Sequence, residues 1–287
     1  MTGLAFLLVI SAAIVHASWN LLTKQINSSG LALVWLFSLL TAAIYLPINL
    51  FLILTNKPQI NTVAIVFMFG TLILHLVYFL MLQQGYRTGD LSVVYPLARG
   101  TGPMLSTLIA IIFLGEQPTT VALLGAGSVI GGVFLLSGGL QTFRERKISE
   151  AVLFGLLTGT IIASYTIWDK IAVSVILVPP LLLDYASASG RTILLAPFAL
   201  REKSELHRLW HTHRRRVLAI AILNPLSYIL ILTAFTFAPV SYIAPAREVS
   251  TLLAVLMGVF LLKEGRLRQK LLAASIIMVG IILLALN

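Results

Sequence analysis

Cysteine is absent from this chain of 287 residues, and acidic residues are scarce: 10 Asp and Glu stand against 20 Lys and Arg. The lack of cysteine excludes disulfide bonds and thiolate metal sites, and it leaves the redox compartment without a signal. Only 10% of the residues are charged, which leaves too little polar surface for a soluble domain of this length.

The chain is instead strongly apolar, with 59% hydrophobic residues and a mean hydropathy of +0.99. These values are typical of a protein whose solvent is lipid. The net charge of +10 does not indicate nucleic-acid binding, because the basic residues lie in short connectors between apolar runs. We therefore predict an integral protein of a bacterial inner membrane, with no nucleic-acid partner. The first apolar run continues past Ile14 without a basic start, so no cleavable signal peptide is expected.

Ten apolar runs approach or exceed the length of about 20 residues that crosses a hydrocarbon core of about 30 Å. Because backbone groups in lipid must be satisfied within their own segment, we expect an all-α polytopic membrane protein with ten transmembrane helices. The expected limits are Gly3–Leu22, Leu31–Leu54, Thr62–Gln83, Leu91–Leu114, Thr119–Ser137, Glu150–Trp168, Pro180–Leu200, Val217–Phe237, Val240–Leu262 and Leu271–Leu286.

Most of the Lys and Arg residues lie in alternate connectors. The other connectors hold only Lys57 and Lys170, while Arg99, Arg191 and Arg247 lie within spans. The positive-inside rule therefore predicts that the basic connectors face the cytoplasm and that both termini lie outside.

The chain contains a weak internal repeat. ASWNLLTK at 17–24 aligns with ASYTIWDK at 163–170, PLAR at 96–99 with APAR at 244–247, and FLGE at 113–116 with LLKE at 261–264. Each copy holds five spans, and an odd number places the second copy in the opposite orientation. We predict two inverted-topology five-helix repeats, residues 1–138 and 150–287, joined by a basic connector at 139–149. This is the plan of many secondary transporters.

The motifs HASWNLLTK, YPLARGTGP and FLGE resemble the EamA type of the drug/metabolite transporter superfamily. The resemblance implies two inverted bundles and a central cavity lined by spans one, three, four, six, eight and nine. It also implies transport of small metabolites such as amino acids, sugars or phosphorylated compounds. Two departures stand out: described members have both termini in the cytoplasm, and the small multidrug relatives carry a first-span Glu where this chain has no acid.

Arg99 lies inside the fourth span, about 12 Å along the helix axis. A charge at that depth costs at least ~2.5 to 3.5 kcal/mol, so it faces a wet cavity or a partner. Pro96 weakens the helix, and Gly100 lets another backbone approach. We expect a local helix break that holds Arg99 on the transport path; the alternative is a structural ion pair with a carboxylate such as Glu248.

Other intramembrane charges add to this site. Arg247 is the repeat counterpart of Arg99, and it points about 100° away from its neighbour Glu248. Asp184 and Arg191 share one face of the seventh span, where they either bracket a polar group or, as we expect, lie at opposite ends near water. The three cations and two anions favour a substrate with a carboxylate or phosphate, because Arg matches either group.

Polar and aromatic residues at helical spacing form stripes on three spans. The stripes are His16, Trp19 and Asn20 in the first span, His75 and Tyr78 in the third, and Asn224 and Tyr228 in the eighth. The predicted substrate-binding residues are these seven together with Arg99, Arg247, Glu248 and Tyr95. Polar contacts between helices, worth about 0.6 kcal/mol each, are the alternative reading of any single residue. His16 or His75 is also a candidate carrier of a coupling proton.

Two further motifs have structural interpretations. In GAGSVIGG at 125–132, Gly127 with Gly131, and Ser128 with Gly132, predict close helix packing and not a phosphate loop. RLWHTHRRR at 208–216 is expected to be a solvated basic loop near lipid headgroups, in preference to a metal site.

The favoured function is a secondary carrier for a small organic metabolite, anionic or zwitterionic, acting by alternating access as a monomer or homodimer. We expect no cofactor and no metal. An intramembrane enzyme acting on a lipid-soluble substrate is the alternative, but the chain has no HExxH, no Gly-x-Ser-x-Gly and no evident nucleophile with a base. A channel would leave the inverted repeat unexplained.

Overall fold

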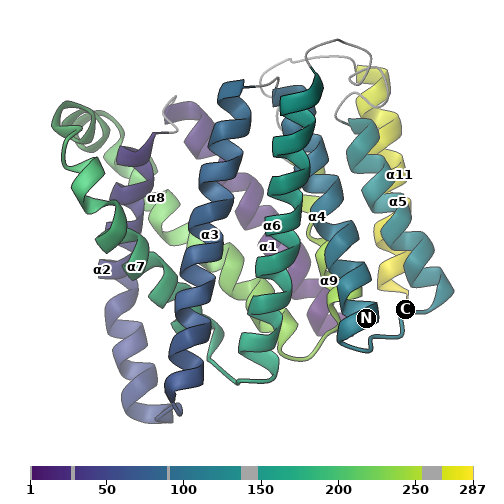
Figure 1. The fold of residues 1–287 in the computed structure, drawn as a ribbon, viewed down its shortest axis with the longest axis horizontal. Helices are drawn as coiled ribbons and strands as arrows, with labels where there is room; N and C mark the ends of the chain where they lie inside the picture. Colours follow the sequence, from purple (N-terminus) through teal and green to yellow (C-terminus); the bar gives the residue numbers. More distant parts are fainter. Residues whose placement is uncertain (1, 27–29, 89–90, 137–147, 254–266, 287) are drawn as a thin grey trace.

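The computed structural model describes residues 2–26, 30–88, 91–136, 148–253 and 267–286. These residues form helices and no strands, and the helices stand side by side with both chain ends at one face (Figure 1). They are α1 Gly3–Ile26, α2 Leu31–Asn56, α3 Thr62–Thr88, α4 Leu91–Phe113, α5 Thr120–Leu136, α6 Ile148–Ser174, α7 Pro180–Ala199, α8 Lys203–Phe235, α9 Val240–Ala246 and α11 Leu267–Ala285.

The membrane-spanning character follows from the helices themselves. Five of the described helices, α1, α2, α3, α6 and α8, are long and apolar enough to cross a bilayer. Large apolar side chains such as Phe51, Phe113 and Ile193 are between 68% and 77% exposed on the outside of the bundle. Such a surface would be unfavourable in water, whereas it is expected where a membrane protein contacts lipid.

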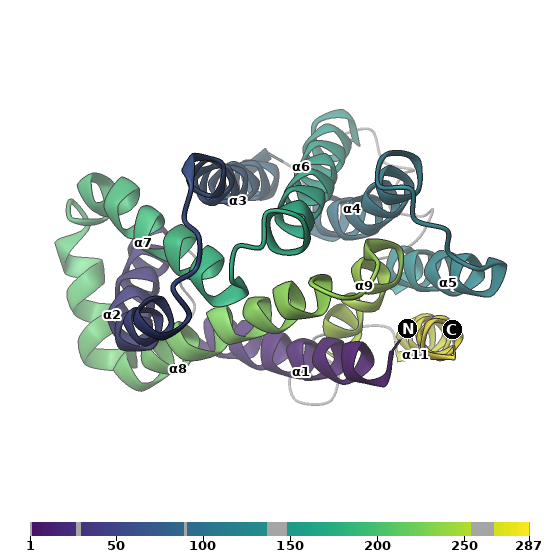
Figure 2. The same cartoon turned by 90° about the horizontal axis from the view of Figure 1, so that it is seen from below.

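The predicted inverted repeat is confirmed in the packing. Helix α1 runs away from the face that holds the termini, and its repeat counterpart α6 runs toward it (Figure 1). Helix α1 packs against α8, and α6 packs against α3. Because α6 is the counterpart of α1 and α8 is the counterpart of α3, these two contacts are equivalent under exchange of the repeats. Counterparts also pair directly, as α2 with α7 and α5 with α11. Seen from below, α1 and α8 lie opposite α3, α4 and α6 (Figure 2).

Helix α6 is longer than the sequence predicted. It continues past Trp168 to Ser174, which places Asp169 and Lys170 inside the helix and not in a connector. The Lys170 Nζ donates to the carbonyls of Phe235, at 2.6 Å, and Ala238, at 3.0 Å. Phe235 is the last residue of α8 and Ala238 lies in the turn after it, where backbone oxygens at a helix end attract a cation. Asp169 and Lys170 therefore do not mark the end of this membrane span.

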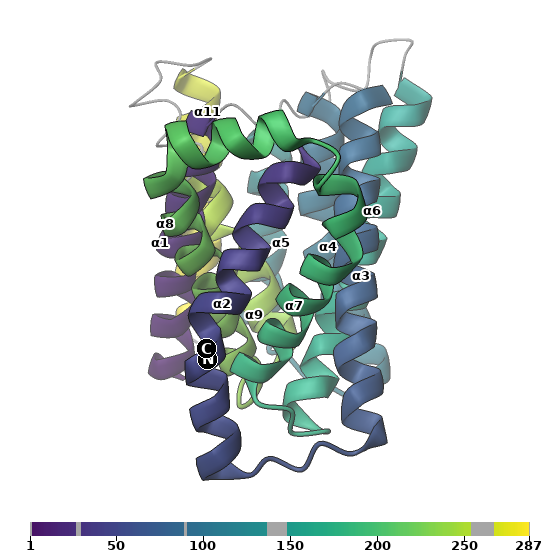
Figure 3. The same cartoon turned by 90° about the vertical axis from the view of Figure 1, so that its left-hand side faces the viewer.

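The prediction of a basic loop at 208–216 is wrong, because this segment belongs to the first part of α8. Figure 3 shows this part crossing the top of the bundle before the helix turns down along the other helices. Leu209 is fully buried in a cluster with Leu33 and Leu36, while Arg214 and Arg215 are exposed. An apolar face packed on the bundle and a charged face in water stabilise an amphipathic helix here.

The close packing predicted for residues 125–132 is present, but on a different face. A methyl group on Gly125 would meet the Gly280 carbonyl oxygen at 2.9 Å, and one on Gly132 would meet Ile277 Cγ1 at 2.5 Å. A methyl group on Gly127 or Gly131 would meet no described atom of another helix within 4 Å. The contact between α5 and α11 therefore depends on Gly125 and Gly132, which are seven residues apart and so lie on one helix face.

We predict that Gly125→Ala lowers the stability of the purified protein by about 1 to 3 kcal/mol, because the added methyl group collides with backbone. Gly127→Ala is the matched control, since its methyl group enters open space. Thermal unfolding in detergent measures both. Equal melting temperatures for the two variants would contradict this account of the α5–α11 contact.

Candidate functional site

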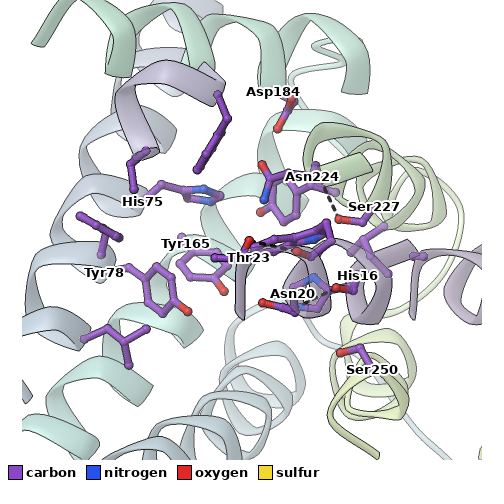
Figure 4. A pocket seen from close by; sticks show the side chains of 18 of the residues that line it. His16, Asn20, Thr23, His75, Tyr78, Tyr165, Asp184, Asn224, Ser227 and Ser250 are labelled. Atoms are coloured by element: carbon purple, nitrogen blue, oxygen red, sulfur yellow. Dashed lines mark hydrogen bonds between the residues drawn. The ribbon is translucent and has the colours of Figure 1, made fainter. Parts of the chain in front are cut away.

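A cavity of about 370 Å³ lies between the two repeats. All six spans implied by the family resemblance contribute residues to its wall, and α2 and α7 contribute as well. Figure 4 shows His75, Tyr78 and Tyr165 on one side of the cavity, with His16 and Asn224 on the other. The volume falls in the range that binds a small organic molecule.

The cavity reaches toward the face of the basic connectors. Its wall includes Thr23, in the last turn of α1, and Gln83, near the end of α3. Toward the face of the termini, the bundle is filled by apolar side chains such as Phe235, Val240 and Ile243, which are fully buried. Of the two faces, the one that holds the termini is therefore the better sealed.

Polar contacts hold the sealed face together. Glu116, in the connector between α4 and α5, accepts hydrogen bonds from the backbone N–H groups of Val240, at 2.7 Å, and Ser241, at 2.8 Å. These two N–H groups begin α9 and have no partner within their own helix, so the carboxylate caps a helix of the other repeat. Lys170 holds the end of α8 nearby.

The structure places most of the predicted site residues around this cavity. Residues that line it are His16, Trp19, Asn20, His75, Tyr78, Arg99, Asn224, Tyr228 and Arg247. Glu248 is buried just behind the wall, and the side chain of Tyr95 is not among those that the structure describes. Their role in binding a substrate stays a prediction.

Arg99 forms an ion pair with Glu248, which was the alternative to a role on the transport path. Its Nε lies 3.0 Å from Glu248 Oε2, and the guanidinium also donates to Thr251 Oγ1 and Ser250 Oγ. Thr251 Oγ1 in turn donates to Glu248 Oε2 at 2.8 Å. The Arg99 charge is therefore neutralised across the two repeats, which leaves it poorly suited to hold a substrate anion.

The prediction of a helix break at Arg99 is wrong, because α4 is continuous from Leu91 to Phe113. The break occurs at the repeat counterpart, where α9 ends at Ala246 and the helix resumes at residue 249. Pro245 has no N–H to donate and crowds the carbonyl one turn before it. The Glu248 and Thr251 N–H groups then bond three residues back, to Pro245 and Glu248, in a tighter turn.

Arg247 lies at this break with its charge unmatched. Its guanidinium carbon lies 5.8 Å from the centre of the Tyr228 ring, a cation–π contact. Within the described part of the chain, the Arg247 side chain makes no hydrogen bond and no ion pair. A half-buried cation without an ion pair can be stabilised by a negative group from outside the protein.

The expectation that Asp184 and Arg191 lie near water at opposite ends of α7 is wrong. Asp184 is only 6% exposed, and both side chains line the central cavity. The two groups interact electrostatically, yet the Arg191 Nε has no hydrogen-bond partner among the described residues. They add one carboxylate and a second incompletely satisfied cation to the site.

Asp169 is a site residue that the sequence analysis missed. It is fully buried on α6 and accepts hydrogen bonds from Thr71 Oγ1, at 2.5 Å, and from the Tyr228 hydroxyl. His75 Nε2 lies 3.1 Å from its Oδ2. The signal was its spacing, since Asp169 follows the cavity residue Tyr165 by four positions and so shares its helix face. We had placed the end of the sixth span at Trp168 because the adjacent Lys170 indicated a connector.

With Asp169 included, the buried charges around the cavity balance. The cations are Arg99, Arg191 and Arg247, and the carboxylates are Asp169, Asp184 and Glu248. No group of three metal-ligating side chains occurs in the described ranges. The site is therefore an ionic and aromatic cavity without net charge when its histidines are neutral.

The comparisons with known proteins agree with this architecture. A family model described as the EamA-like transporter family matches residues 3–138 and again residues 149–286. No curated protein matches the chain. Among 28 matching chains of solved structures, one described as a crystal structure of a protein has a TM-score of 0.77 over 100% of this chain and 98% of its own. Its 15% identity supports the fold alone.

We predict that Arg99→Met and Glu248→Met each destabilise the protein by about 3 to 5 kcal/mol, because each leaves one buried charge unpaired. The double variant should lose less than the sum of the two, since no charge is then left alone. Thermal unfolding of the three variants in detergent measures this. Additive losses would show that the pair contributes no coupling.

Proposed function

Because this chain belongs to the EamA-like transporter family, we propose that it is a secondary carrier of a small zwitterionic metabolite, such as an amino acid. The observation that carries the proposal is Arg247, a half-buried cation on the cavity wall whose contact is an aromatic ring and not a carboxylate. Arg191 is a second cation on the same wall.

Arg247 supplies the anchor for the negative end of the substrate. A guanidinium presents donors in a planar fork that matches a carboxylate or phosphate. In a cavity of low polarity such a charge-assisted contact is strong, because the protein has already removed much of the water from the cation. We therefore propose that Arg247 and Arg191 bind the negative group of the substrate, in place of the predicted pair Arg99 and Arg247.

The rest of the wall favours a substrate that also carries a positive group. The three carboxylates and three arginines leave no net charge for a simple anion to neutralise. Asp184 faces the cavity without an ion pair within the described residues and supplies a position for an ammonium group. The rings of Trp19, Tyr78 and Tyr165 provide apolar area for the remaining atoms.

The asymmetry of the two faces supports alternating access. Glu116 and Lys170 hold the ends of α8 and α9 together at the sealed face, while the cavity reaches toward the basic connectors. Exchanging the conformations of the two inverted repeats would seal the basic face and open the other. With the positive-inside orientation, the described state is open toward the cytoplasm.

A ligand screen tests the substrate class. We expect at least one member of a panel of standard amino acids and small carboxylated or phosphorylated metabolites to raise the melting temperature of the purified protein. Arg247→Gln should weaken its apparent affinity by roughly 10- to 150-fold, the equivalent of one charge-assisted hydrogen bond. Arg215→Gln, on the exposed face of α8, is the matched control. A simple sugar as the sole ligand, bound equally by Arg247→Gln, would contradict the proposal.

The absence of cysteine makes the sealed face directly testable. In Ser227→Cys the thiol lies on the cavity wall, and a membrane-impermeant maleimide should react with it mainly from the side of the basic connectors. Adding Glu116→Gln weakens the cap on α9, so labelling from the side of the termini should rise several-fold. Comparing right-side-out with inside-out vesicles measures both. Equal labelling from the two sides in the Ser227→Cys background would favour a channel.

A further inference from the structure

The cluster around Asp169 bridges the two repeats. The carboxylate belongs to α6, its partners Thr71 and His75 belong to α3, and Tyr228 belongs to α8. We propose that His75 and Asp169 form a proton-binding site, through which a proton is carried together with the substrate. This inference rests on the proposed carrier function.

The cluster has the composition that a proton site needs. Asp169 is fully buried, and no Lys or Arg of the described chain lies within ion-pair distance of it. Its charge is stabilised by two hydroxyl donors and, when the imidazole is protonated, by His75. His75 is the one ionisable cation in contact with this carboxylate among the described side chains, and an imidazole ring can take up and release a proton.

A route for the proton is present as well. The His75 side chain is 14% exposed and lines the cavity, whereas Asp169 is shielded behind it. A proton therefore enters from cavity water onto His75 and passes from its Nε2 to Asp169 Oδ2, 3.1 Å away. The transfer leaves a neutral imidazole and a neutral carboxyl group, so the pair holds one proton and no net charge.

The position of the pair between the repeats links the proton to the conformational change. If α3 moves relative to α6, Thr71 and His75 withdraw from Asp169 and remove its donors. An ionised carboxylate left without donors in a buried site is strongly unfavourable, whereas a protonated one is not. The rearrangement therefore proceeds with the proton bound.

Tyr228 links the proton to the substrate. Its single hydroxyl hydrogen is donated to Asp169, and its ring lies beside the Arg247 guanidinium. When Asp169 takes a proton, that hydroxyl is released to donate to a carboxylate bound at Arg247. Proton and substrate thus favour each other's binding, which is the condition for co-transport.

Other charged and titratable groups surround the pair. The arginines keep their charge at all relevant pH values, and the tyrosines ordinarily ionise near pH 10. His16 and Asp184 are therefore the rival titrating groups in the cavity. The groups that line the same cavity are Tyr78 on α3, Tyr165 on α6, Asp184 and Arg191 on α7, Arg247 after α9 and His16 on α1. Arg99 and Glu248 are paired with each other, and Lys170 bonds to carbonyls at the end of α8.

The first experiment needs no substrate. The full-length protein, with isotope-labelled histidine, is titrated in lipid nanodiscs and followed by NMR, with the His75 signal assigned through His75→Gln. We expect the His75 signal to respond to pH, and Asp169→Asn to lower the midpoint of that response, because the variant removes the carboxylate that contacts the imidazole. Asp184→Asn, which removes a carboxylate that does not contact His75, should move it less. An unchanged midpoint in Asp169→Asn overturns the site.

The second experiment tests coupling in proteoliposomes loaded with a pH-sensitive dye, with a mixture of the standard amino acids as the probe. In the native protein, entry of the amino acids should acidify the lumen. Asp169→Asn and Tyr228→Phe should abolish the acidification, because each removes a group through which the proton and the substrate are linked. Exchange without acidification in the native protein overturns the coupling and leaves the carrier function intact. Absence of any exchange counts against the proposed function, and the NMR titration then decides the proton site.

Discussion

The neutralisation of buried charge between the repeats is the constraint on which the rest of this structure depends. Lipid offers no water to an ionised group, so each charge in the bundle needs a partner, a donor or access to a wet cavity. Arg99 of the first repeat meets Glu248 of the second, and Asp169 of the second meets Thr71 and His75 of the first. These contacts fix the two bundles around the cavity that separates them.

The same requirement extends to the backbone at the prolines. Pro225 in α8 has no N–H for the Ala221 carbonyl, and the Thr41 hydroxyl of α2 donates to that carbonyl at 2.8 Å. The Tyr45 hydroxyl donates to the neighbouring Ile222 carbonyl at 2.9 Å. Where helices are weakened, side chains from the other repeat replace the missing bonds, as is general for proline in membrane helices. These bonds hold the part of α8 around Pro225 in place beside the cavity, where Asn224 lines the wall.

The repeat is symmetric in packing and asymmetric in chemistry. Trp19 and Tyr165 occupy equivalent positions and both line the cavity, as do Tyr78 and Tyr228. Asp169, however, has Thr23 as its counterpart. In the carrier that we propose, symmetric packing lets two similar conformations exchange at low cost, and asymmetric charge gives each conformation a different affinity for protons and substrate. A carrier needs both properties.

The sequence by itself determined the helices, their inverted arrangement and most of the residues that meet at the cavity. Hydropathy marks spans because lipid demands continuous apolar helices, and stripes such as His16 with Asn20 mark an inward face because helical periodicity is local. Gly125 and Gly127 looked equivalent, since local spacing does not say which face meets another helix.

Tertiary structure alone decided how the charges are matched. Which cation is satisfied depends on the distance between side chains from different repeats, and this left Arg99 paired and Arg247 without an ion pair in the described structure. It also buried Asp169, which stood beside a lysine at the apparent end of a span. Electrostatic pairing depends on positions in space, and the order of residues along the chain does not specify those positions.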